Sequence, residues 1–191
     1  MNDSPLGLIK HHVRVNHQRV LTRTEDLNAD QLSWRPESNA PSIGFHLWHI
    51  ARWADLLLEI LQGPGSQLWD KENLSERWGL NAKELGLAES GTSMDDEGLA
   101  RLSLSKNDMI DYARRVFAAV EDAVEALTDE DFRSMYAGSR TQDWWHGRTI
   151  GYSLMVHLTH EIRHCGMIEG LRGAQGADVN DDPKLTPTES E

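Results

Sequence analysis

The sequence has one cysteine, no long apolar run and fewer basic than acidic residues. Because Cys165 stands alone, no internal disulfide can form, and we expect the reducing conditions of a cytoplasmic location. No stretch approaches the roughly 20 apolar residues that a transmembrane helix needs, so we expect no association with a membrane. The N-terminal residues also lack the basic and apolar regions of a secretory signal.

Charge and motif content narrow the class of partner. The chain carries 31 acidic and 19 basic residues, a formal net charge of −12, and no basic run. A nucleic-acid-binding surface needs a concentrated basic patch, so we expect none here. The sequence also contains neither a phosphate-binding glycine loop nor a dinucleotide fingerprint. The absence of these motifs argues against a nucleotide cofactor. We expect a small-molecule substrate as the partner.

Four long segments show the apolar spacing of helices rather than strands. A length of 191 residues suits one domain with a substantial core. The segment after Ser42 is the clearest, since its apolar residues alternate at four- and three-residue spacing until Gly63-Pro64-Gly65 ends it. We therefore predict an all-α protein, a four-helix bundle over residues 1–173, with helices at about 5–27, 42–62, 104–127 and 149–171.

The remaining segments divide into a structured connection and a tail. Residues 62–104 contain Trp69 and Trp78, so we expect a partly helical lid over one end of the bundle rather than a flexible linker. The sequence around Asn28 predicts a turn, and Thr128 resembles the cap of a short extra helical turn. Residues 174–191 are acidic and rich in Pro and Thr, which is typical of a disordered tail.

The last predicted helix carries two apolar stripes. Met155 and Ile162 belong to one, while His160, His164 and Met167 belong to another on roughly the opposite side. A helix that is apolar on both sides is usually buried between neighbours. We therefore expect its histidines to point into a protein-lined cavity.

Three histidines form a candidate metal site. His160 and His164 are four residues apart, so they lie one turn apart on the same face of a helix. His49 in the second predicted helix can supply a third imidazole. Closed structural zinc sites normally use four ligands, whereas catalytic sites keep one position open. Three nitrogens therefore indicate a metal centre that performs chemistry or presents a ligand.

Several neighbouring residues compete for roles at this site. His46, one turn before His49, and His157, three residues before His160, are each a possible ligand, hydrogen-bond partner or core residue. Trp53 shares the face of His49, so it either walls the pocket or packs in the core. The remaining histidines have no such placement, and we expect them to be solvated: His11, His12, His17 and His146.

Glu161 introduces a protease hypothesis. The run from His160 to His164 has the spacing of the HExxH metalloprotease motif, although no histidine follows it as a third ligand. Glu161 projects about 100° around the helix from His160, which favours a structural role. We likewise expect Asp55 to be a solvated or capping charge, and Cys165 to serve packing rather than nucleophilic catalysis.

Three segments together resemble the DinB/YfiT-like superfamily over roughly residues 5 to 172. They are Gln31–Pro36 (QLSWRP), Ser42–Ala51 (SIGFHLWHIA) and His160–Gly166 (HEIRHCG). The resemblance implies a four-helix bundle, often a homodimer, with a divalent metal on three histidines. Those positions correspond here to His49, His160 and His164. The chain departs from the family near Cys165 and Met167, where Arg and Gln are frequent, which bears on the polarity of the pocket.

The resemblance also implies an activity. Members include enzymes that use low-molecular-weight thiols, so we expect a metal-dependent S-transferase or isomerase that activates a thiol. One alternative is a hydrolase that uses metal-bound water. Another is a stress-associated binding or scaffold protein in which the metal is structural. Imidazole ligands leave the ion undetermined among zinc, nickel, iron and manganese.

Overall fold

The computed structural model describes residues 4–136 and 147–177, and the described part of the chain is helical. It contains no strand, only the isolated bridges Leu87–Thr92 and Met135–Thr149. The four long helices are α1 (Pro5–Thr22), α3 (Ile43–Gln62), α7 (Lys106–Glu125) and α9 (Ile150–Ala174). The short ones are α2 (Ala29–Ser33), α4 (Leu68–Lys71), α5 (Leu74–Arg77), the 3-10 turn η1 (Ala82–Glu84), α6 (Asp96–Arg101) and α8 (Asp129–Arg133).

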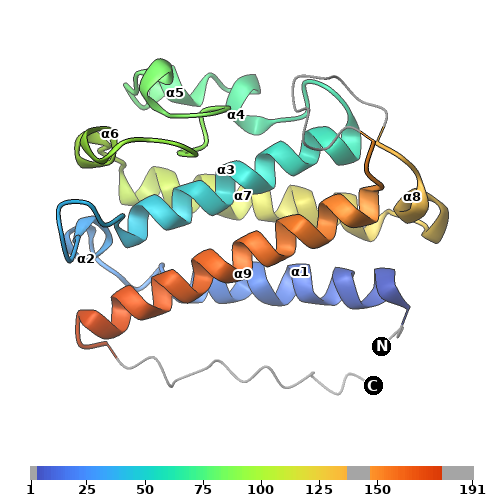
Figure 1. The fold of residues 1–191 in the computed structure, drawn as a ribbon, viewed down its shortest axis with the longest axis horizontal. Helices are drawn as coiled ribbons and strands as arrows, with labels where there is room; N and C mark the ends of the chain where they lie inside the picture. Colours follow the sequence, from blue (N-terminus) through green and yellow to red (C-terminus); the bar gives the residue numbers. More distant parts are fainter. Residues whose placement is uncertain (1–3, 137–146, 178–191) are drawn as a thin grey trace.

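The four long helices lie side by side (Figure 1), and α3 is the central one. It packs against α7 and α9, while α1 packs against the same two helices from the other side. Nearly every residue of α3 is buried, as its high apolar content predicts. This packing confirms the predicted all-helical fold and brings the middle of α3 against α9, where the candidate histidines lie.

Each long helix begins at a hydroxyl residue. These N-cap side chains accept a hydrogen bond from a backbone amide in the first turn, which satisfies a donor that has no partner within the helix. The caps are Ser4, Ser42, Ser105 and Thr149. Short α8 is closed by a capping box between Thr128 and Asp131, as the sequence predicts.

The first helix is shorter than predicted. It ends at Thr22 rather than near Leu27, and the Thr24 hydroxyl donates to the Val20 carbonyl oxygen at 2.8 Å just beyond that end. Such side-chain bonds compete with continued helix. Leu27 is nevertheless buried, so its apolar character reflects core packing in a loop. Asn28 then caps the short helix α2, where only a turn was expected.

Helix α9 buries one stripe rather than two. Leu154, Leu158, Glu161, Cys165 and Ile168 face the core. Met155 and Ile162, which were expected to be buried, are each 48% exposed. The prediction was wrong because apolar side chains lie on two faces of α9, and only one of these faces packs against α1 and α3.

The segment between α3 and α7 has the expected short helical turns, but it lies along α3 (Figure 1) and contacts the middle of that helix at Arg52 and Asp55, rather than covering one end of the bundle. Asp55 joins it to the bundle. Its two carboxylate oxygens accept from the backbone amides of Leu68 and Trp69, at 2.8 Å each, which caps α4. Asp55 is fully buried, so the capping expectation was right and the solvated alternative was wrong.

Arg52 makes a second connection to the lid. The residue is 1% exposed, and its guanidinium donates to the carbonyl oxygens of Ala88 and Glu89, at 3.0 and 2.9 Å. It also pairs with Asp55 at 3.1 Å. A buried guanidinium needs such partners because its desolvation is costly. The lid segment around residues 88–90 is therefore held in place above α3.

The predicted tail falls mostly outside the described residues, because α9 ends at Ala174 and residues 178–191 are not described. His146 also lies outside them. None of the described helices has the length and apolarity to cross a bilayer.

Candidate metal centre

His49 of α3 meets His160 and His164 of α9 between the two helices. One ring nitrogen of each lies within 4.8 Å of the others. The Nε2 atoms of His49 and His160 are 3.1 Å apart. The structure thus brings together the three side chains that were predicted to share an ion.

The spacing of His49 and His160 fits a tetrahedral ion. Two imidazole nitrogens that each lie about 2.0–2.1 Å from such an ion are roughly 3.3 Å apart, close to the observed 3.1 Å between His49 and His160. His49 and His164 are buried and His160 is half-buried, so water competes little for their nitrogens. Within the described residues, no carboxylate or thiol joins this group. The donor set is therefore three imidazoles, which leaves one position of a tetrahedral ion without a ligand from the described residues.

Burial keeps these imidazoles neutral. The pKa is lowered to about 4 for His49, about 3 for His160 and about 2 for His164, chiefly because burial disfavours the charged ring. The positive charge that His49 would carry contributes to the lowering at His160 and His164. A neutral imidazole has a free lone pair, so protons do not compete with an ion at neutral pH.

The lid orients His49. Its Nδ1 lies 2.5 Å from the Ser90 carbonyl oxygen, which can only accept, so Nδ1 carries the proton and Nε2 is left free toward His160. Metal-binding histidines commonly donate their second ring N–H in this way, which sets the tautomer and the ring direction. Sequence spacing gives no indication of this contact across 41 residues.

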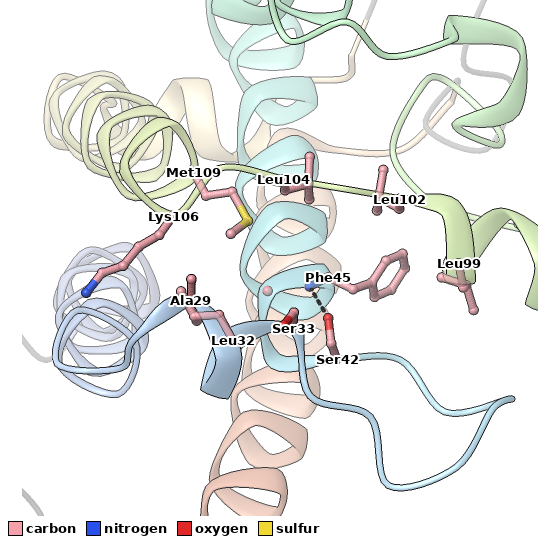
Figure 2. Close-up of a pocket in the computed structure, with 11 residues that line it drawn as sticks. Ala29, Leu32, Ser33, Ser42, Phe45, Leu99, Leu102, Leu104, Lys106 and Met109 are labelled. Carbon is pink, nitrogen blue, oxygen red and sulfur yellow. Dashed lines mark hydrogen bonds between the residues drawn. The ribbon is translucent and has the colours of Figure 1, made fainter.

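Two aromatic rings enclose the cluster. Phe45 stacks on His49 with ring centroids 5.4 Å apart, and the ring centroids of Trp53 and His160 are 4.5 Å apart. Figure 2 shows the Phe45 side chain extending toward Leu99 and Leu102, which belong to the lid. The cavity drawn there holds about 40 Å³ and is lined by no histidine. It has room for only a few water molecules, so we interpret it as a packing gap beside the site.

His46 is a neighbour of the cluster. Its Nδ1 lies 3.0 Å from Nδ1 of His164, which places it within hydrogen-bonding distance of one of the three. Burial lowers the pKa of His46 to about 4. On the other side, Arg163 Nη2 is 3.3 Å from His164 Nε2. His164 is thus flanked by groups that can orient its ring.

Glu161 and His157 face away from the cluster, toward α1. Glu161 Oε1 is 2.8 Å from His157 Nε2, and its Oε2 accepts from Asn16 at 2.9 Å. Burial alone raises the pKa of Glu161, but the contacts with His157 and His17 hold it far below its usual range. The structure therefore opposes the protease hypothesis, because the carboxylate that would serve as base is engaged elsewhere.

His17 was expected to be solvated, and this was wrong. It is 1% exposed, stacks on Phe117 and places Nδ1 2.8 Å from Glu121 Oε1. Its Nε2 lies 3.4 Å from Glu161 Oε1. Burial alone lowers the pKa of His17, but the two carboxylates raise it to about 9. These partners lie more than 100 residues away in sequence, so no local pattern pointed to them.

Cys165 follows His164 but faces the core. It is 2% exposed, and burial raises the pKa of its thiol to about 12. A protonated thiol is a poor nucleophile, so the side chain serves packing, as expected.

Met167 lies beside the cluster on the surface of a larger cavity. This cavity has a volume of about 480 Å³ and is also lined by His46, His164 and Phe45. Met167 itself is 43% exposed. The pocket position expected for this residue thus agrees with the structure, although a role in binding stays a prediction.

Comparisons with known proteins agree with this geometry. The family model of the DinB superfamily matches residues 12–168. No curated protein matches. Among solved structures, the fold is similar to the conserved protein of a locus from Enterococcus faecalis, with a TM-score of 0.70 and 16% identity over 87% of this chain and 94% of that one. At this identity the likeness concerns the fold alone.

Proposed function

The chain belongs to the DinB superfamily, and from this membership and the three-histidine cluster we propose that it is a divalent-metal-dependent enzyme. We propose further that it activates a low-molecular-weight thiol for transfer to an electrophile, as an S-transferase or isomerase. The observation that carries the proposal is the convergence of His49, His160 and His164 from two helices. Imidazole ligands suit zinc, nickel and iron better than manganese, which prefers oxygen ligands.

The residues of the site have separable tasks. His49, held by Ser90, presents Nε2, and His160 presents Nε2 opposite to it. Because all three imidazoles are neutral, they leave the full positive charge of a divalent ion in place. Such an ion, when bound, would lower the pKa of a coordinated thiol. Phe45 and Trp53 cover the His49 and His160 rings, which limits access of bulk water.

The placement of Glu161 favours a thiol over water as the activated group. Hydrolytic sites of the HExxH type use the glutamate as general base, but here its carboxylate is bound by Asn16 and His157. A thiol bound to a divalent ion would release its proton to solvent at neutral pH, so its activation would not depend on a carboxylate base. For this reason we place the hydrolase second.

Metal content is the first test. We expect elemental analysis of the purified, tag-free protein to give about one divalent ion per chain, and a His49→Ala/His160→Ala variant to give none. The matched control is His11→Ala/His12→Ala, which removes two histidines of α1 outside the cluster. Equal metal content in all three proteins would place the ion elsewhere and overturn the proposal.

Turnover is the second test. Each metal-loaded protein is incubated with monochlorobimane and either cysteine or glutathione, and the fluorescent conjugate is followed. We expect conjugation above the background rate in wild type and in the control variant, and its loss in the double variant. Metal-dependent cleavage of 4-nitrophenyl acetate without any thiol conjugation would instead support the hydrolase. Stoichiometric metal without either activity would favour the structural-metal alternative.

A further inference from the structure

The cavity beside His164 is apolar. Apart from His46 and His164, its walls are formed by Pro41, Phe45, Met167 and Leu171, together with Ala40 and Gly170. No lysine, arginine or carboxylate lines it. A charged ligand would lose hydration there without gaining a partner, so this surface favours uncharged carbon groups.

A second large cavity makes the contrast clear. It has a volume of about 500 Å³ and is lined by the charged residues Arg52, Glu59, Asp70 and Glu89. None of the clustered histidines contributes to it. Of these two large cavities, the one that reaches the histidines is therefore the apolar one.

The size of the apolar cavity suits a small molecule. A volume of about 480 Å³ lies within the range of roughly 300–1,000 Å³ that is typical of ligand pockets. Gly170 leaves space in its wall, because a Cβ added there meets no heavy atom within 4 Å. Met167 is 43% exposed at the rim, and an apolar ligand would cover it.

We propose that the small-molecule electrophile of this enzyme carries an uncharged alkyl or aryl group, which binds in the cavity between Pro41, Phe45, Met167 and Leu171. Its reacting end then lies toward His164 and the other two histidines. This inference rests on the proposed metal-dependent function, which it narrows to apolar substrates.

The test uses alkyl hydroxamates, whose head group binds metal ions and whose tail length can be varied. With zinc-loaded protein, affinity is measured calorimetrically from acetohydroxamate to octanohydroxamate. If the tail enters the cavity, the dissociation constant falls roughly three- to fourfold for each added methylene. Equal affinity for all tail lengths would overturn the inference while leaving the metal centre intact.

Two glycine variants of α9 locate the tail. In Gly170→Leu the new side chain fills the cavity, so we expect acetohydroxamate to bind as in wild type and the dependence on tail length to disappear. Gly166→Leu is the matched control, since Gly166 is also open but does not line the cavity. In Gly166→Leu, the affinity should still depend on tail length as in wild type. Loss of the dependence in both variants, or in neither, would contradict the proposed location.

A metal-free measurement separates the two proposals. Indole is titrated into metal-free protein labelled with ¹³C at the methionine methyl groups, and Met167→Leu identifies the signal of Met167. We expect this signal to shift in wild type and in Gly166→Leu, but not in Gly170→Leu. If no hydroxamate binds because no ion is held, a shift still supports the apolar cavity and only the metal proposal fails. An unmoved signal in wild type would overturn the cavity proposal by itself.

Discussion

His49 on α3 donates its Nδ1–H to the Ser90 carbonyl oxygen in the lid, so the lid holds the ring that faces His160. The contact links the long connection between α3 and α7 directly to the candidate metal centre. The lid therefore does more than cover the bundle, because its backbone sets the tautomer of one proposed ligand.

Gly91 secures this part of the lid, and we expect Gly91→Ala to disturb the site. A Cβ at Gly91 would lie 2.8 Å from Phe45 Cε2 and 2.9 Å from Trp48 Cζ3, and its φ of +85° is unfavourable for alanine. Overpacking of this kind costs about 1–3 kcal/mol. Displacing the adjacent Ser90 carbonyl should also weaken metal affinity about 10- to 100-fold, as measured by chelator competition.

Gly79→Ala is the control for Gly91→Ala. Gly79 also has a positive φ, +67°, but an added Cβ meets nothing within 4 Å. It should cost only the backbone strain of about 1–2 kcal/mol and leave metal affinity unchanged. Equal metal affinity in both variants would show that Ser90 does not orient His49.

Asp55 should be among the most sensitive residues for stability. It accepts from Arg52, from the Tyr112 hydroxyl at 2.8 Å and from two backbone amides of α4. In Asp55→Ala, Arg52 remains buried without its carboxylate, which costs about 3–5 kcal/mol in urea unfolding. The exposed Asp111→Ala should change stability by less than about 1 kcal/mol. If Asp55→Ala also lowered the free energy of unfolding by less than about 1 kcal/mol, the proposed role of Asp55 would be contradicted.

His17 should make stability depend on pH in the alkaline range. Its pKa is about 9 in the folded chain and about 6.5 when unfolded, so the folded state binds the extra proton between these values. The stabilisation is complete below pH 6.5 and is lost as pH rises through 9. We expect the free energy of unfolding to decrease by up to about 3 kcal/mol over this range. Urea unfolding curves recorded from pH 6 to 9.5 measure this decrease. His17→Gln should remove this decline, and an unchanged slope would assign it to other groups.

The homodimer implied by the family resemblance stays a prediction, and α9 offers a surface for it. Exposed residues recur on this helix at alternating three- and four-residue spacing, which is typical of helix–helix seams: Tyr152, Met155, Thr159 and Ile162. If a second copy packs here, Met155→Lys/Ile162→Lys should be monomeric in light scattering. Met135→Lys, at an exposed apolar residue off this helix, should leave the mass unchanged. A dimeric double variant would exclude this surface.

Much of the helical architecture follows from local sequence. Ser42 as cap, the apolar repeat after it and Gly63 as stop define α3 because capping and amphipathic spacing act within a few residues. The same locality places His160 and His164 on one face of α9. The resemblance to DinB-like proteins, carried by short motifs, selected His49 as their partner.

Other features depend on contacts between distant segments, which periodicity does not encode. His17 looked like a surface histidine until α7 and α9 placed Glu121 and Glu161 on either side of its ring. Asp55 looked like a surface charge until the lid brought two unpaired amides to it. The sequence by itself determined which long helices form and which histidines share a face. Only tertiary packing decided which polar groups are buried, because a buried charge is stable only where its partners converge.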